Sequence, residues 1–171
     1  HDYHLYLLAE FLRRDLPQAV IQHYVHIPWP SSRYWQMIPS YIVRRICSSL
    51  CSTDILGFQS PQDCRSFLDT VEEFLPKAQV DRREGTVIWQ DQMTRVNSYP
   101  ISINVAEVQS IANSPRAVEY ASRLTQKCNE MNIVRIDRAE PNKNIVRGFK
   151  AFGLLLSRYP ELRGRVNFLA F

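Results

Sequence analysis

Short runs of β-branched and aromatic residues alternate along the chain with longer stretches in which apolar positions recur at helical spacing. The short runs predict β-strands, and the longer stretches predict amphipathic helices. Strands are predicted at Ala19–Ile27, Asp54–Gln59, Asn132–Asp137 and Arg165–Phe171. Two further runs, Thr86–Gln90 and Thr94–Tyr99, flank a short polar turn and predict a β-hairpin or a pair of short strands.

Serine and proline mark where the predicted helices begin and break. Pro39 predicts a kink or a break, Ser60 followed by Pro61 is a favourable helix start, and Ser114 with Pro115 indicates a restart. The predicted helices are Leu5–Arg14, Arg33–Ser49, Pro61–Leu75, Glu107–Asn129 and Asn142–Tyr159. Alternating strands and helices predict an α/β fold, with a mostly parallel sheet covered by helices on both faces.

Charge and cysteine usage narrow the class of protein. The chain has 171 residues and a formal net charge of +4, without any block of like charges that would indicate a nucleic-acid-binding tail. This mild surplus of positive charge fits a small phosphate-bearing ligand better than it fits nucleic acid. The four cysteines lack metal-binding spacing and are typical of reduced thiols in a cytosolic protein. No apolar run approaches the roughly 18 residues that a membrane span needs. We therefore expect a cytoplasmic protein without nucleic-acid or membrane partners.

The two ends of the sequence suggest that it is part of something longer. No initiating methionine is present, the opening HDYHL resembles a loop that follows a strand, and the chain stops within an apolar run. The opening residues also lack a signal-peptide pattern. We expect an internal piece of a longer protein.

Ligands of α/β proteins collect at the carboxyl ends of strands, and two loops predicted there contain histidine. In HDYH, Asp2 either accepts hydrogen bonds from sugar hydroxyls or caps the following helix. In HIPWPSS, Pro28 and Pro30 hold the residues before them extended, so His26 ends a strand in a stiff loop beside Trp29. The sequence leaves open whether His26 is a packed core residue or a functional one.

The loop RIDRAEPNKN carries three basic side chains between a strand and a helix. Arg135 and Arg138 offer bidentate forks for phosphate oxygens, and Lys143 offers a point charge. The N-terminus of the next helix would add its dipole. The loop therefore predicts a diphosphate clamp. The alternative is a solvated loop with an Arg135–Asp137 or a Lys143–Glu140 ion pair.

Five short stretches resemble, in order, the motifs of the retaining glycosyltransferases of family 20, the trehalose-6-phosphate synthases. They are HDYHL, HIPWPSS, DILGFQS, YPISIN and RIDRAEPNKN. That family shows H-D-Y-H-L, H-I-P-F-P-S, a D-L-I-G-F-H-like strand, P-I-G-I-D and R-x-D-x-x-K-G, so the resemblance covers essentially the whole chain. It implies a GT-B fold of two Rossmann-like halves. Residues 1–104 would hold the later part of the N-terminal half, 105–131 a helical connection, and 132–171 the first βαβ unit of the C-terminal half.

The resemblance also implies a reaction. A glucosyl unit would pass from UDP-glucose or GDP-glucose to a phosphorylated sugar, with retention and without a metal or cofactor. Asp2 would contact the acceptor sugar and His26 would lie beside the donor sugar. Arg135 and Lys143 would hold the donor diphosphate and offset charge on the leaving nucleotide. The family's N-terminal glycine loop, acceptor-phosphate residues and acidic ribose-binding motif lie outside this chain, so the fragment alone is expected to be inactive. A homo-oligomer of the full-length protein is left open.

Several positions depart from the family motifs. Ser102 and Asn104 replace the Gly and Asp of P-I-G-I-D, and Lys143 follows Arg135 by eight positions rather than five. Arg138 is therefore an alternative basic ligand. The departures leave open another acceptor, such as a glycerol or cyclitol phosphate, and a non-catalytic relative that binds a sugar phosphate. A phosphorylase of the same architecture is a third hypothesis, which a cofactor-binding lysine in the missing C-terminal part would reveal.

Overall fold

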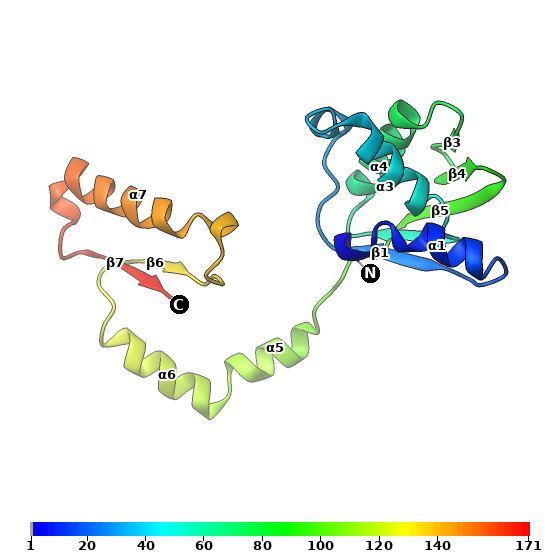
Figure 1. Ribbon diagram of the computed structural model, residues 1–171. Coiled ribbons are helices and arrows are strands. Elements are labelled where there is room, and N and C mark those ends of the chain that lie inside the picture. The colour runs from blue at the N-terminus through cyan, green and yellow to red at the C-terminus, as the bar shows by residue number, and fades with distance from the viewer. Residues whose placement is uncertain (1) are drawn as a thin grey trace. The chain divides into compact units, whose positions relative to one another are not determined.

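The computed structural model describes residues 2–171, which form two compact units (Figure 1). The first unit ends at Ser102, and the second comprises Ile103–Phe171. The sequence placed the end of the first domain at residue 104 and a helical connection at 105–131. In the structure the helices of that connection group with the second unit.

A five-stranded mixed sheet lies at the centre of the first unit. In spatial order its strands are β1 (Gln22–Val25), β2 (Ile55–Phe58), β5 (Gln92–Ser98), β4 (Thr86–Trp89) and β3 (Gln79–Asp81). The β1, β2 and β5 strands are parallel, whereas β5, β4 and β3 pair antiparallel. The predicted hairpin is confirmed in β4 and β5. Strand β3 was not predicted, because its three residues contain a single apolar side chain and become a strand by pairing with β4.

The helices of the first unit share one hydrophobic core with one face of this sheet. They are the one-turn 3₁₀ helix η1 (Tyr3–Leu5), α1 (Leu8–Asp15), α2 (Ser32–Trp35), α3 (Ser40–Leu50) and α4 (Pro61–Phe74). Leu56 and Phe58 of β2 pack into that core with Phe67 of α4 and Val43 of α3, all less than 2% exposed. On the other face, Arg95 and other polar side chains of the central strands are exposed. The prediction of a sheet covered on both faces is therefore wrong for the described part of this unit.

The helix boundaries follow the predicted punctuation. A break at Pro39 separates α2 from α3. The Ser60 hydroxyl accepts the Asp63 N–H at 3.2 Å with Pro61 at the first helical position, so α4 begins where Ser60 and Pro61 predict. Asp63 also accepts a hydrogen bond from the Ser60 hydroxyl at 2.5 Å, which ties the cap together.

The second unit contains a strand–helix–strand motif preceded by two helices. Its elements are α5 (Val105–Ala112), α6 (Pro115–Thr125), β6 (Met131–Arg135), η2 (Pro141–Lys143), α7 (Ile145–Arg158), η3 (Pro160–Leu162) and β7 (Val166–Ala170). Strands β6 and β7 are parallel, and α7 lies between them in the chain. Phe149 and Phe152 of α7 pack on Phe168 of β7, with ring centroids 5.2 and 5.1 Å apart. The restart predicted at Ser114 is confirmed by its hydroxyl, which accepts the Ala117 N–H at 3.2 Å.

Candidate functional site

The predicted site residues fall into two groups, each within one unit. Asp2 and His26 belong to the first unit and lie at the carboxyl end of β1. Arg135 and Lys143 belong to the second unit and lie between the end of β6 and the start of α7. Both groups therefore occupy the strand ends at which α/β folds bind ligands.

The Asp2 carboxylate contacts the end of strand β1. Its Oδ1 atom accepts a hydrogen bond from the backbone N–H of His26 at 3.2 Å, and the Asp2 N–H donates to the Tyr24 carbonyl at 2.7 Å. The side chain makes no capping hydrogen bond to the described N–H groups of η1. The alternative that Asp2 caps the following helix is therefore wrong, and the structure brings Asp2 and His26 together.

The backbone of Asp2 is strained. Its φ of 67° and ψ of 178° lie in a region that non-glycine residues rarely occupy and that costs on the order of 1–3 kcal/mol. Such a conformation persists only where the surroundings over-determine it. Here the hydrogen bonds to Tyr24 and from His26 fix both the main chain and the carboxylate of Asp2. The carboxylate is thus pre-set at the end of β1.

The loop after His26 is anchored to helix α4 through Trp29. The Trp29 backbone N–H donates to Asp63 Oδ1 at 2.9 Å, and its indole Nε1 donates to Thr70 Oγ1 at 3.1 Å. The Trp29 side chain is only 3% exposed and packs edge-on against Phe67. The stiff loop that the prolines predict is therefore also held by side chains of α4, and this fixes the chain direction just after His26.

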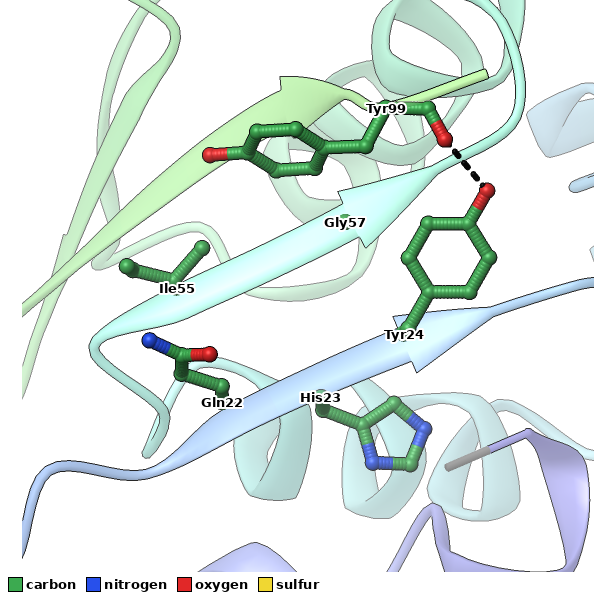
Figure 2. Close-up of a pocket in the computed structure, with 6 residues that line it drawn as sticks. All are labelled: Gln22, His23, Tyr24, Ile55, Gly57 and Tyr99. Carbon is green, nitrogen blue, oxygen red and sulfur yellow. Dashed lines mark hydrogen bonds between the residues drawn. The ribbon is translucent and has the colours of Figure 1, made fainter. Parts of the chain in front are cut away.

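The sheet face opposite the core is hollowed into a cavity of about 490 Å³ (Figure 2). Its lining residues are Gln22, His23, Tyr24, Ile55, Gly57 and Tyr99. The Tyr24 hydroxyl donates to the Tyr99 carbonyl at 2.6 Å. A Cβ at Gly57 would lie 2.8 Å from the Tyr24 ring and 2.9 Å from the Tyr99 ring, so the two rings fit only over glycine. Figure 2 shows the His23 ring on the other side of β1, toward the helices.

Sequence reasoning missed Tyr24, although a signal was present. Side chains alternate along a strand, so Tyr24 shares a face with His26 two positions later. In the structure the two rings make an edge-on contact with centroids 4.7 Å apart. His26 is thus partly buried against an aromatic neighbour as well as bonded through its amide to Asp2.

In the second unit, the Arg135 guanidinium is bonded to the protein itself. Its Nε donates to Asp137 Oδ2 at 2.5 Å, its Nη2 donates to the Lys143 carbonyl, and its Nη1 reaches the Asn144 carbonyl at 3.5 Å. The predicted Arg135–Asp137 ion pair is confirmed, and the Arg135 side chain is only 18% exposed. Gly148 in the first turn of α7 leaves room for the guanidinium, because a Cβ there would collide with Nη1. Arg135 thus fastens the RIDRAEPNKN loop to the start of α7.

The other two basic side chains of this loop face an open cavity of about 450 Å³ at the carboxyl ends of β6 and β7. Its lining residues are Ile136, Asp137, Arg138, Lys143 and Phe171. The Arg138 side chain is 81% exposed and lies 3.2 Å from Glu140, so Glu140 pairs with Arg138 rather than in the predicted Lys143–Glu140 pair. Helix α7 begins at Ile145, directly after this turn, so the positive end of its dipole lies near Lys143.

Among the described residues, no three His, Cys, Asp or Glu side chains lie close enough to hold a metal ion. All four cysteines are free. Burial raises the pKa of the Cys47 thiol to about 12 and that of Cys64 to about 11, which keeps both protonated and unreactive near neutral pH. Separately, none of the described helices has the length and apolar character that crossing a membrane requires.

Comparison with known proteins gives consistent matches over the whole chain. The sequence model of glycosyltransferase family 20 matches residues 1–171. Validamine 7-phosphate valienyltransferase of Streptomyces hygroscopicus subsp. jinggangensis is 32% identical over 154 residues, which are 90% of this chain and 30% of that protein. Trehalose-6-phosphate synthase of Escherichia coli is 29% identical over 168 residues, 98% of this chain and 35% of that protein.

Solved structures agree with these sequence matches. An Escherichia coli structure described as trehalose-6-phosphate bound with UDP-2-fluoro glucose superposes with a TM-score of 0.79 and 28% identity. The match covers 99% of this chain and 37% of that one. The chain thus spans about a third of the length of the relatives that it matches. The expected α/β architecture of GT-B type is confirmed by the similarity to these structures.

Proposed function

The chain belongs to glycosyltransferase family 20, and from that premise we propose that the full-length protein transfers a glucosyl unit from a nucleotide sugar to a phosphorylated sugar or polyol. The anomeric configuration would be retained. The expected product is trehalose 6-phosphate, the compound for which the relatives called trehalose-6-phosphate synthases are named. The observation that carries the proposal is Asp2, whose carboxylate is fixed beside His26 at a strand end despite a strained backbone. Strain of this kind clusters at functional sites.

In this proposal Asp2 binds hydroxyl groups of the acceptor, and His26 lies beside the donor sugar. One Asp2 oxygen accepts the His26 N–H, which leaves lone pairs on the carboxylate for sugar hydroxyls. Because the protein has already fixed the carboxylate, little orientation would remain to be lost when the sugar binds.

For the donor diphosphate we propose Arg138 and Lys143 as the contacting cations, with Arg135 supporting them. Arg138 and Lys143 line the cavity after β6, whereas the Arg135 guanidinium is bonded to Asp137 and to carbonyls at the start of α7. Arg138 also precedes Lys143 by five positions, the spacing of the family motif that the sequence resembles. The two cations would stabilise the charge that develops on the leaving nucleotide.

The roles of Arg138 and Arg135 can be distinguished by substitution in the full-length protein. Arg138→Ala is expected to raise the KM for the nucleotide sugar about tenfold without lowering stability, because a mostly exposed ion pair contributes little. Arg123→Ala is the matched control, since Arg123 is an exposed helical arginine 3.9 Å from Glu119. A KM for the donor that Arg138→Ala leaves at the wild-type value contradicts the assignment.

The names of two relatives support one acceptor class. One is named for the compound that receives the valienyl group, validamine 7-phosphate, and another for the product that it makes, trehalose 6-phosphate. A phosphorylated polyol is common to both, so we propose acceptors of that class, with glucose 6-phosphate, glycerol phosphate and cyclitol phosphates as the compounds to compare. We further propose that the reaction needs no metal or cofactor and takes place in the cytoplasm.

The decisive experiment expresses the full-length protein with UDP-glucose or GDP-glucose and each acceptor in turn. Release of nucleoside diphosphate and an α-configured product measured by NMR are expected. Asp2→Asn should lower kcat/KM at least about 100-fold, since it removes the charge of a group fixed at the site. Asp15→Asn is the matched control, because Asp15 is a surface carboxylate paired with Arg14. The absence of nucleotide release with every acceptor would refute the proposal.

A second candidate is a non-catalytic relative that binds a sugar phosphate. The departures at Ser102 and Asn104 motivated it, but Asn104 has a structural role of its own. Its side-chain oxygen accepts the Glu107 N–H at 3.2 Å and caps α5. Asparagine and aspartate cap helices about equally well, so this replacement is compatible with an intact enzyme. Binding of a sugar phosphate without turnover in the same assay would favour this candidate.

A further inference from the structure

Two tyrosine rings meet over Gly57 on the sheet face that lies opposite the core (Figure 2). Tyr24 of β1 pairs with Gly57 of β2, and Tyr99 directly follows β5 on the other side of β2. A Cβ atom at Gly57 would lie 2.8 Å from the Tyr24 ring and 2.9 Å from the Tyr99 ring. Glycine within a strand weakens it and often marks a close approach of other groups. The glycine here therefore makes the room in which the two rings lie.

The Tyr24 ring is held at its tip as well as at its base. Its hydroxyl donates a hydrogen bond to the Tyr99 carbonyl at 2.6 Å. The Tyr99 main chain is fixed in turn, because its N–H donates to the carbonyl of Phe58, the last residue of β2, at 2.8 Å. Rotation of the Tyr24 side chain would break the bond to Tyr99. That bond therefore selects one orientation of the Tyr24 ring.

The His26 ring packs against the Tyr24 ring. The two ring centroids are 4.7 Å apart and the interplanar angle is 67°, an edge-on geometry that is favourable for aromatic rings. The Asp2 carboxylate accepts the main-chain N–H of His26. This bond fixes the backbone of His26 but leaves the direction of its imidazole to contacts of the ring itself. The Tyr24 ring supplies such a contact.

We propose that Tyr24 is a positioning residue for the glycosyl transfer, because it holds the His26 imidazole toward the donor sugar. The contacts are continuous: the Phe58 carbonyl holds Tyr99, and Tyr99 holds the tip of the Tyr24 ring. That ring in turn contacts the imidazole. The inference rests on the proposed function, which places His26 beside the donor. Loss of the Tyr24 ring should therefore impair use of the nucleotide sugar and leave binding of the acceptor intact, since Asp2 is bonded to the main chain of His26.

The test uses the full-length protein with Tyr24→Leu, which keeps an apolar side chain in β1 and removes both the ring and the hydroxyl. The KM for the nucleotide sugar should rise about tenfold, as expected for a misplaced contact. The KM for the phosphorylated acceptor should stay within about twofold. Tyr24→Phe keeps the ring and loses the bond to Tyr99, so its donor KM should lie between those of wild type and Tyr24→Leu. A crystal structure of Tyr24→Leu should show the His26 imidazole turned from its wild-type direction.

Gly57→Ala disturbs the same contact from the neighbouring strand. The added Cβ would displace both rings, so this variant should also raise the donor KM, although Tyr24 itself is unchanged. Tyr41→Leu is the matched control, because Tyr41 is a tyrosine of α3 that is 71% exposed, and it should leave both KM values near wild type. If Tyr24→Leu changes both KM values alike, or neither, the positioning role is wrong. A Gly57→Ala variant with the wild-type donor KM also contradicts it.

Failure of the proposed function would look different. A wild-type protein that releases no nucleotide with any acceptor refutes the glycosyl transfer itself. The crystal structure of Tyr24→Leu then still decides the contact: a His26 ring in its wild-type orientation overturns the inference.

Discussion

The two units hold their polar loops in different ways. In the first unit, Asp2 and Trp29 are tied by backbone hydrogen bonds to a strand and to helix α4, above a dense core. In the second unit, one side chain, Arg135, fastens the loop that carries Arg138 and Lys143. The first arrangement gives a fixed carboxylate, and in the second Arg138 and Lys143 line an open cavity. Under the proposed function, a fixed carboxylate suits sugar hydroxyls that need defined directions, and an arginine with a lysine suits a diphosphate.

The largest expected effect concerns Trp29, which anchors the loop after His26 in the first unit. Trp29→Ala should lower the free energy of unfolding of the first unit by about 3–5 kcal/mol, the usual cost of removing a large buried aromatic side chain. The measurement is the denaturant midpoint of the full-length protein followed by fluorescence. Trp29→Phe, which keeps an aromatic ring and loses the bond to Thr70, should cost much less. Equal losses for the two variants would show that packing of the ring does not hold the loop.

The next effect concerns Asp63, which links α4 to the loop after His26. Asp63→Ala should cost about 2–3 kcal/mol, because it leaves the buried Trp29 N–H without its acceptor and weakens the Ser60 cap. Asp63→Asn retains an acceptor oxygen and should cost less. Both are measured as shifts of the denaturant midpoint. An Asp63→Ala variant as stable as wild type would mean that the bond to Asp63 does not help to hold the loop.

A pH effect of about 2 kcal/mol is expected from His23. Its folded pKa of about 4 lies below the ordinary value of 6.5, so the unfolded chain binds the proton more readily. Stability is therefore complete above pH 6.5 and is lost as the pH falls from 6.5 toward 4, at up to about 1.4 kcal/mol per pH unit. Chemical denaturation across this range measures the loss. His23→Phe should remove this component of the pH dependence, and an unchanged profile would contradict it.

The sequence predicted more of the fold than of the site. The strands other than β3, the break at Pro39 and the helix start at Ser60 depend on local patterns, so they were predicted correctly. The Arg135–Asp137 ion pair was among the predicted alternatives, but the bonds from Arg135 to the start of α7 were not predictable, because those main-chain acceptors become neighbours only when the loop folds back. His23 was overlooked for a similar reason: in a strand, the sequence alone does not show that a histidine is buried with its Nε2 atom unpartnered among the described residues.

The smallest expected effect is a difference in stability between alanine variants of two glycines in helix α7. Gly153 has nothing within 4 Å of a Cβ, so Gly153→Ala should stabilise the second unit by about 0.5–1 kcal/mol, the helix preference of alanine over glycine. At Gly148 the same Cβ would displace the Arg135 guanidinium, and the loss of its hydrogen bonds should cancel that gain. Because the loop would then be released, Gly148→Ala should also raise the KM for the nucleotide sugar, whereas Gly153→Ala should not. Thermal unfolding and donor kinetics of the two full-length variants make the comparison. A Gly148→Ala variant with the stability gain and donor KM of Gly153→Ala would show that the second unit does not depend on Arg135 to hold its cations.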